Sequence, residues 1–401
     1  MNPSRSERRI CELLASAGIT VNGSKPWDPH IHSPRFFGKV ATGGTLAAGE
    51  SYMDGWWDVD ALDDFFARVE CAGLARNIGG WPALVLAVKG RVANLQSHAR
   101  ARHVARKHYN LGNDLFQAML GRHMQYSCAY WHGATTLDQA QENKLHLICR
   151  KLGLKPGMRL LDLGGGFGGL AQLAAAEYGC DVVAYNISRE QVAYARDLCR
   201  WLPVRIEEKD YRAAASEPRS FDRIVSVGLF EHVGHKNYRA FFELVRGQLA
   251  DCGLFLLHTI GGNNWRTATD PWIDKYIFAG GVLPSPAQVM TAAEGLWVLE
   301  DWHNFGPDYD RTLMAWWRNF DAAWPDLSTH YGDHFYRMWK YYLMSCAGAF
   351  RARTLQLWQI VLSKGDVASY HPVRELHAQP PLGATCSRDL HPTQDQRPCG
   401  A

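Results

Sequence analysis

The segment 161–169 reads "LDLGGGFGG", an apolar run that passes directly into a row of glycines. Glycine in such a turn lets the backbone approach a ligand closely, because it carries no Cβ atom. The helix expected after the turn begins with N–H groups that have no partner within the helix and can bind a ligand. A strand, a glycine turn and a helix in this order are typical of nucleotide-binding α/β folds.

The glycine spacing is compatible with two types of cofactor. Gly164, Gly166 and Gly169 satisfy the GxGxxG pattern of dinucleotide-binding folds. Asp162 begins a DxGxGxG pattern, completed by Gly164, Gly166 and Gly168, that is associated with S-adenosylmethionine (SAM) methyltransferases. The loop alone leaves both cofactors open, with a purely structural turn as a lesser alternative.

Two residues at the ends of later strands favour SAM. Asn186 ends the second predicted strand, where an NAD site has Asp or Glu for the ribose hydroxyls. Its amide can still donate and accept hydrogen bonds there, but the plain NAD signal is missing. Asp210 ends the third predicted strand, where methyltransferases supply an acidic or amide group for the adenine edge.

Short apolar strands alternate with longer amphipathic helices over the region 106–365, which predicts an α/β domain with a doubly wound parallel sheet. The predicted strands are 159–163, 181–187, 204–210, 222–227 and 253–260. We therefore assign 108–365 to a Rossmann-like catalytic domain. Residues 1–90 form a small mixed α+β domain with helices at 6–17 and in "DVDALDDFFARV" (58–69), residues 91–107 form a linker, and the proline-rich tail 366–401 is expected to be disordered.

The composition, with 47% hydrophobic and 21% charged residues over 401 residues, is that of a soluble globular protein with two domains. No apolar run reaches the roughly 18 to 20 residues of a membrane-spanning helix, and the polar N-terminus lacks a secretory signal. We expect a cytoplasmic protein. Its ten cysteines lack CxxC pairs and zinc-ligand spacing, so we expect free thiols and no metal. A net charge of +3 gives no signal for a nucleic-acid partner.

Six cations and no acidic residue occur in the stretch 88–110, "VKGRVANLQSHARARHVARKHYN". A solvated linker helix explains this charge as well as a contact with an anionic surface does. For a lipid surface, each nearby cation adds about 1 kcal/mol of attraction. Both interpretations are kept.

The chain resembles the bacterial cyclopropane fatty acid synthases over about residues 45–365. The motifs that carry the resemblance occur in the expected order: "SYMDGWW", "KHYNLGNDLF", "QYSCAYW", "SVGLFEHVGHKNY", "LLHTIG", "DPWIDKYIF", "EDWHNFGPDYDRTLMAWW" and "SCAGAFRARTLQLWQ". The chain departs from the family at the glycine loop, where "GGGFGG" replaces the usual GCGWGG. Gly165 stands in place of Cys and Phe167 in place of Trp. Both changes keep the glycines of the turn, so SAM binding should survive, although Phe167 removes an indole N–H donor.

The resemblance implies methylene transfer from SAM to the cis double bond of unsaturated phospholipid acyl chains. Methyl transfer leaves a carbocation, and bound bicarbonate acts as the base that removes a proton to close the ring. The implied bicarbonate site is formed by Cys128, Glu231, His258, Ile260 and Tyr309. In this assignment Tyr309, His258 and backbone N–H groups near Cys128 and Ile260 donate to the anion, and Glu231 accepts its hydroxyl proton. Taken singly, these residues also fit structural roles: a buried thiol, a core histidine, a helix cap and a core phenol.

The predicted SAM-binding residues combine the glycine loop with the strand ends and the "QYSCAYW" segment. They are Tyr126, Ser127, Asp162, Gly164, Gly165, Gly166, Asn186, Gln191 and Asp210. The expected partner is a phospholipid bilayer, contacted peripherally at the inner face of the cell membrane through the N-terminal domain and the linker. The sequence is compatible with a homodimer as well as with a monomer.

Three other functions were weighed against cyclopropanation. A nucleobase amino-methylating enzyme is disfavoured, because the slot after the fourth strand holds "FEHVG" in place of Asn or Asp followed by Pro-Pro and an aromatic residue. A relative that methylates the same alkene and leaves a methyl branch or a hydroxyl would differ only in the fate of the cation. A non-catalytic lipid-binding paralogue should have lost the base-site residues, and none is lost here.

Overall fold

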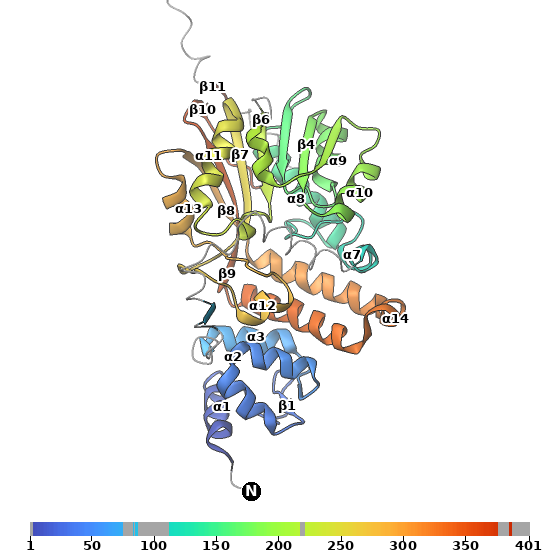
Figure 1. The fold of residues 1–401 in the computed structure, drawn as a ribbon, viewed down its shortest axis with the longest axis vertical. Coiled ribbons are helices and arrows are strands. Elements are labelled where there is room, and N and C mark those ends of the chain that lie inside the picture. Colours follow the sequence, from blue (N-terminus) through green and yellow to red (C-terminus); the bar gives the residue numbers. More distant parts are fainter. Residues whose placement is uncertain are drawn as a thin grey trace, which may run out of the picture.

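The computed structural model describes residues 3–74, 83, 85, 86, 112–216, 221–375, 385 and 386. Figure 1 shows a sheet with helices on both sides, a pair of long antiparallel helices beneath it, and the N-terminal helices farthest from the sheet. The functional cavities described below lie where the sheet meets these helices.

Seven strands form one sheet in the order β5-β4-β3-β6-β7-β9-β8. The first five of them in sequence are parallel to one another, as predicted. They are β3 (Arg159–Leu163), β4 (Asp181–Asn186), β5 (Val204–Glu208), β6 (Phe221–Val227) and β7 (Leu249–Gly262). Their bounds differ from the sequence prediction by a few residues at most, because β3, β4 and β6 are short apolar runs that are largely buried.

The sheet is not entirely parallel, which corrects the sequence prediction. Strand β9 (Leu355–Ser363) lies antiparallel between β7 and β8 (Val298–Asn304). Neither β8 nor β9 was predicted. The β8 sequence "VLEDWHN" has few apolar residues, and its place at the sheet edge is set by pairing with β9.

Alternate strand residues contact different helical layers, as a two-sided sheet requires. Leu160 packs in one cluster with α8 (Leu137–Lys151), α9 (Gly169–Tyr178) and α10 (Arg189–Leu198). Leu161 packs in another with α11 (Tyr238–Gln248), α13 (Pro286–Ala293) and the 3-10 helix η1 (Tyr211–Ser216). The doubly wound α/β architecture is therefore confirmed.

The helix α14 (Pro307–Arg351) consists of two antiparallel segments that reverse at Gly332 (Figure 1). Gly332 has a φ of 71°, a left-handed conformation that favours glycine. Aromatic residues hold the two segments together; Phe320 stacks on Tyr336 with ring centroids 5.8 Å apart. This hairpin separates the sheet from the N-terminal helices.

The N-terminal segment is mainly helical and shares its hydrophobic core with α14. It contains α1 (Arg5–Ser16), β1 (His30–Ile31), α2 (Arg35–Met53), β2 (Trp57–Asp58) and α3 (Leu62–Cys71), and the two short strands pair with each other. Asp63 and Asp64 of α3 both form ion pairs with Arg351 of α14. A Cβ on Gly348 of α14 would lie 2.7 Å from the backbone N of Ala67, so glycine is needed for this close approach.

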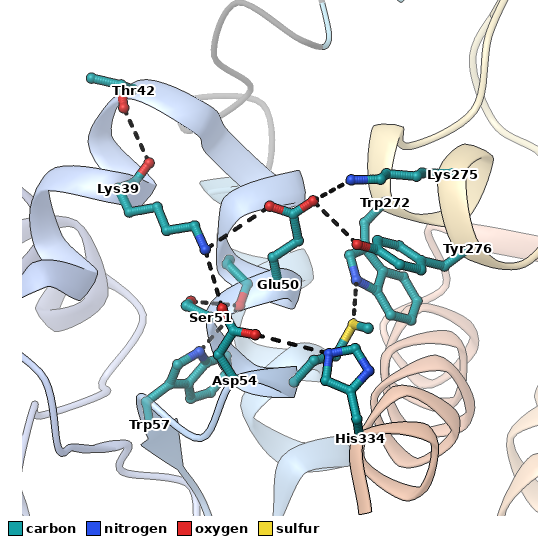
Figure 2. A network of polar contacts seen from close by, with 12 residues as sticks. Lys39, Thr42, Glu50, Ser51, Asp54, Trp57, Trp272, Lys275, Tyr276 and His334 are labelled. Atoms are coloured by element: carbon teal, nitrogen blue, oxygen red, sulfur yellow. Dashed lines mark hydrogen bonds and ion pairs between the residues drawn. The ribbon is translucent and has the colours of Figure 1, made fainter. Parts of the chain in front are cut away.

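Figure 2 shows how α2 is joined to α12 (Pro271–Tyr276) and to α14. Glu50 of α2 accepts hydrogen bonds from Lys275 at 2.6 Å and from the Tyr276 hydroxyl at 3.2 Å. Asp54 lies 3.8 Å from His334 of α14. Hydrogen bonds and ion pairs therefore surround the buried apolar contacts between α2, α12 and α14. They orient the N-terminal segment on the catalytic domain.

Two sequence expectations concern parts of the chain that are described incompletely. The basic stretch 88–110 and most of the tail lie outside the described residues. The expected start of disorder at residue 366 is too early, however, because β10 (Val367–Ser369) pairs with β11 (Thr385–Cys386) and Arg374 forms an ion pair with Asp301. The expectation that all cysteines are free is also wrong, since Cys252 is disulfide-bonded.

Candidate active site

The glycine loop between β3 and α9 is shaped by left-handed backbone conformations. Gly164, Gly166 and Gly168 have φ values of 100°, 54° and 86°. The N–H groups of Gly164 and Gly165 donate to the carbonyl oxygen of Tyr185 at 3.0 and 2.9 Å, which ties the loop to β4. A Cβ built on Gly166 meets no protein atom within 4 Å, so this residue borders open space.

That open space is the first of two cavities, and it lies at the carboxyl ends of the parallel strands. All nine predicted SAM-binding residues line it: Tyr126, Ser127, Asp162, Gly164, Gly165, Gly166, Asn186, Gln191 and Asp210. They come from the glycine loop, from the ends of β4 and β5 and from the segment 125–131. Such a crevice at the strand ends is where open α/β sheets bind ligands.

Two predicted residues of this cavity already have partners within the protein. The Asn186 amide nitrogen donates to the Gly166 carbonyl at 2.9 Å and to the Gln191 side-chain oxygen at 2.8 Å. Asp210 forms an ion pair with Arg212 at 2.9 Å. Asn186 therefore connects β4 to the glycine loop and orients Gln191, beyond the ribose contact expected from the sequence.

Lys144, which is fully buried near this cavity, was not among the predicted site residues. Its ammonium group donates to the hydroxyl of Ser127 at 3.0 Å and to the side-chain oxygen of Gln125. Burial lowers the pKa of Lys144 and raises that of Asp162, and each charge counteracts the shift of the other. The signal in the sequence was its position in α8, four residues after Ala140 and seven after Leu137, on the apolar face.

The second cavity adjoins the first and contains all five predicted bicarbonate-site residues: Cys128, Glu231, His258, Ile260 and Tyr309. Five residues line both cavities: Tyr126, Ser127, Gly228, His232 and Phe278. Away from this junction the lining is mostly apolar, and it includes side chains of α1, α2, α3 and α14. The cavity therefore extends from the strand ends into the N-terminal core.

Glu231, in the 3-10 helix η2 (Phe230–His232), is one of two titratable groups that line the second cavity and have an unpaired buried atom among the described residues. Its Oε1 accepts a hydrogen bond from the backbone N–H of Ile260 at 2.6 Å. Its Oε2 is buried and has no hydrogen-bond partner at normal geometry among the described residues. Burial raises the pKa of Glu231 to about 7, against the lowering effects of the Ile260 N–H and of the Thr259 hydroxyl. The N–H of Ile260 is thus already used, which differs from the expectation that it donates to an anion.

His258, on β7, is the second of these groups. The side-chain amide of Gln359 on β9 donates to its Nδ1 at 3.2 Å, which places the proton of the neutral ring on Nε2. Nε2 is buried and has no hydrogen-bond partner. Burial keeps the pKa of His258 well below its usual value, so the ring is a neutral donor. The sequence analysis did not identify Gln359, because β9 was not predicted.

Cys128 and Tyr309 also line the second cavity. The N–H of Ala129, next to Cys128, donates to the Thr312 hydroxyl at 3.1 Å, so it too is used within the protein. Burial raises the pKa values of both the Cys128 thiol and the Tyr309 phenol, which remain protonated at neutral pH. Tyr309 packs against Phe350 with ring centroids 4.6 Å apart. The Cys128 thiol donates to the Ala129 carbonyl at 3.2 Å, so the site can offer the Tyr309 hydroxyl as a neutral donor beside a carboxyl and an imidazole.

The loop departure at Phe167 is accommodated by aromatic packing. The ring is buried and makes contacts with Phe116, at 5.7 Å between centroids, and with Tyr194, at 5.5 Å. Phe116 belongs to α7 (Asn113–Leu120) and Tyr194 to α10. Phe167 thus packs under the glycine loop, where an indole N–H is not required for the turn.

Comparisons with known proteins place this chain among lipid-modifying enzymes. The model of the mycolic acid cyclopropane synthetase family matches residues 96–360. The cyclopropane-fatty-acyl-phospholipid synthase of Escherichia coli (strain K12) is 53% identical over 355 residues, which is 88% of this chain and 92% of that protein.

Solved structures agree with the sequence comparisons. The cyclopropane synthase MmaA2 from Mycobacterium tuberculosis is 30% identical with a TM-score of 0.61, over 68% of this chain and 100% of that one. The mycolic acid cyclopropane synthase CmaA1, in complex with SAH and CTAB, is 32% identical with a TM-score of 0.59, over 65% of this chain and 97% of that one.

Proposed function

This chain belongs to the cyclopropane synthase family, and from that membership we propose that it transfers a methylene group from SAM to the cis double bond of unsaturated phospholipid acyl chains. The observation that carries the proposal is the junction of the two cavities. A site for a polar cofactor opens there onto a mostly apolar cavity, and that second cavity is lined by a buried carboxyl and a buried imidazole.

The first cavity suits SAM. SAM supplies an electrophilic methyl group when it is bound. The glycine loop leaves open space at Gly166, and Gln191 and the Asp210–Arg212 pair provide polar groups at the strand ends. Tyr126 and Ser127 line both cavities, so they border the point at which the methyl group must pass to the alkene.

The second cavity suits an acyl chain that passes through a cationic state. An isolated alkene is a weak nucleophile, so it must be held at about 3 to 3.5 Å from the methyl carbon. After transfer, the carbocation has to be protected from water. Phe278, Tyr309 and Tyr342 line this cavity and offer aromatic faces, which attract cations and exclude water.

We further propose that bicarbonate binds beside Glu231 and His258. Bicarbonate supplies the base for the proton that must leave the new methyl group. It combines one O–H donor with acceptor oxygens, which complements the unpaired Oε2 of Glu231 and the unpaired Nε2–H of His258. The phenol of Tyr309, which stays protonated, is an additional donor in the same cavity, whereas the Cys128 thiol donates to the Ala129 carbonyl at 3.2 Å.

The protein is also proposed to act at a membrane surface. No helix within the described residues is long and apolar enough to cross a bilayer. Phospholipid acyl chains lie inside the bilayer, so the enzyme must associate peripherally, here with the inner face of the cell membrane, and draw a chain into the second cavity. The basic stretch 88–110, outside the described residues, is one proposed contact for this association.

The test is the lipid mass spectrum of cells that express this chain. Addition of one CH2 to unsaturated acyl chains, with a cyclopropane ring located by fragmentation, supports the proposal. A methyl branch or a hydroxyl in place of the ring would assign the chain to the alkene methylation that differs in the fate of the cation. Unmodified lipids, from cells in which the protein accumulates and binds SAM, would contradict methylene transfer altogether.

A further inference from the structure

The loop 263–270, which joins β7 to α12, carries an exposed tryptophan. The Trp265 side chain is 58% exposed, and it is one of four large exposed hydrophobic residues in the described chain. Because the loop follows the carboxyl end of β7, it lies at the same sheet edge as His258 and Ile260. An exposed indole presents an apolar body and a polar N–H to any surface that approaches this edge.

The same loop forms part of the lining of the second cavity, in which the acyl chain is proposed to bind and which is called the acyl cavity below. Arg266, Thr269 and Asp270 all line that cavity. The Asn263 side chain donates to the backbone carbonyl of Arg353 at 2.8 Å, which joins the loop to the segment between α14 and β9. Thr354 of that segment and Leu355, the first residue of β9, also line the cavity. Trp265 therefore stands at the rim of the acyl cavity, between two segments that form its wall.

Two arginines at this rim lack a carboxylate partner. The guanidinium of Arg266 has no hydrogen bond or ion pair within the part of the chain that the structure describes. The exposed Arg353 donates only to the side-chain oxygen of Gln356, at 2.7 and 3.2 Å. The nearby acidic groups of the lining are Glu70 and Asp270, and Asp270 accepts from the N–H groups of Trp272 and Ile273 at the start of α12. Both cations thus remain available to an anionic ligand.

We propose that Trp265, Arg266 and Arg353 form the surface that seats the mouth of the acyl cavity on a phospholipid bilayer. This rests on the proposed function. An indole has an apolar body and a polar N–H, and it is favoured at the membrane–water interface. A guanidinium binds phosphate through paired N–H donors. Arg266, which lines the cavity, contacts the phosphate of the lipid whose chain enters it, while Trp265 enters the interface beside it.

The chain contains a matched control at the opposite sheet edge. Trp201 is 86% exposed and also has an arginine neighbour, Arg200, which lies 5.5 Å from its ring and pairs with Asp197. These residues precede β5, so they lie at the amino ends of the strands, away from both cavities. The same pair of residue types is therefore present where no acyl chain enters.

The experiment compares vesicle binding by the full chain and two double variants, W265A/R266Q and R200Q/W201A. Vesicles of phosphatidylcholine, with and without phosphatidylglycerol, are sedimented across a salt series. Loss of the indole should cost about tenfold in affinity if half of its exposed area enters the lipid. Loss of the cation should cost about fivefold more on anionic vesicles and reduce the salt dependence. R200Q/W201A should bind as the unchanged protein does.

The outcomes separate this proposal from the proposed function. Equal vesicle binding by W265A/R266Q and the unchanged protein would overturn the docking surface, even where lipid analysis shows cyclopropane formation. Equal losses in both double variants would also overturn it, because the effect would then not depend on position. SAM titration and the thermal unfolding midpoint of W265A/R266Q show whether the variant is folded. Failure of the unchanged protein to modify lipids would contradict the proposed function and leave the vesicle result standing.

Discussion

Replacement of Glu231 by glutamine should separate catalysis from cofactor binding and from stability. Glutamine keeps the shape of the side chain, and its oxygen can still accept the N–H of Ile260, which lies 2.6 Å from Oε1. The amide cannot accept a proton. We expect SAM affinity to be unchanged and turnover to fall by about 10² to 10⁴, the usual contribution of a positioned acid or base.

The same variant should be more stable than the unchanged protein at alkaline pH. Burial raises the pKa of Glu231 from 4.5 to about 7 in the folded protein, which corresponds to about 3 kcal/mol at about 1.4 kcal/mol per pH unit. Between these two values the folded state holds a proton that the unfolded state has released. This stabilising effect is complete below pH 4.5 and is lost as the pH rises through 7, whereas glutamine has no such dependence.

The assay combines three measurements on Glu231→Gln and the unchanged protein. Calorimetric titration gives SAM affinity, turnover is followed from pH 6 to 8.5, and chemical unfolding is compared at pH 5 and pH 8. The activity of the unchanged protein should rise through pH 7, and the stability advantage of the variant should grow by up to about 3 kcal/mol between the two pH values. Normal turnover in the variant, or an equal stability difference at both pH values, would refute the assignment of Glu231 as a buried proton acceptor.

Three further substitutions test other parts of the molecule. Gly166→Val should abolish SAM binding in a calorimetric titration, because the valine side chain would project into the first cavity. Gly133 also has a positive φ and open space around it but lies outside that cavity, so Gly133→Val should still bind SAM. Lys144→Met should weaken SAM binding at least about tenfold, because Ser127 and Gln125 lose a buried charged donor; an unchanged titration would remove Lys144 from the site. Arg351→Met should lower the free energy of unfolding by about 3 kcal/mol, because Asp63 and Asp310 lose a half-buried partner. Arg200→Met, at an exposed ion pair, should lower it by less than about 1 kcal/mol. Similar losses in the two variants would show that the Arg351 cluster is an ordinary surface contact.

Features of the fold that depend on local pattern could be predicted from the sequence. The parallel strands β3, β4 and β6 are short apolar runs, and a buried strand needs little more than such a run between turn residues. Strand β9 has an equally apolar sequence but follows a 45-residue helical hairpin. Its antiparallel pairing depends on where that hairpin returns the chain, which no local pattern records.

Residues of the site were identified from motifs, and their partners were not. Glu231 and Ile260 stand 29 positions apart, and His258 and Gln359 stand 101 apart. Each pair meets because neighbouring strands and loops bring them to one sheet edge. The sequence analysis therefore assigned the Ile260 N–H to an anion, whereas the fold gives it to the Glu231 carboxylate.

The sequence by itself determined the cofactor loop, the alternation of strands and helices, and the residue types of the reaction site. These are local properties, because a left-handed turn needs glycine and a buried strand needs apolar side chains wherever they occur. Only the tertiary structure decided that the N-terminal helices share a core with α14 and that the second cavity reaches from the strand ends into that core. It also decided which polar atoms are left without partners, since burial and pairing depend on groups that are distant in the chain.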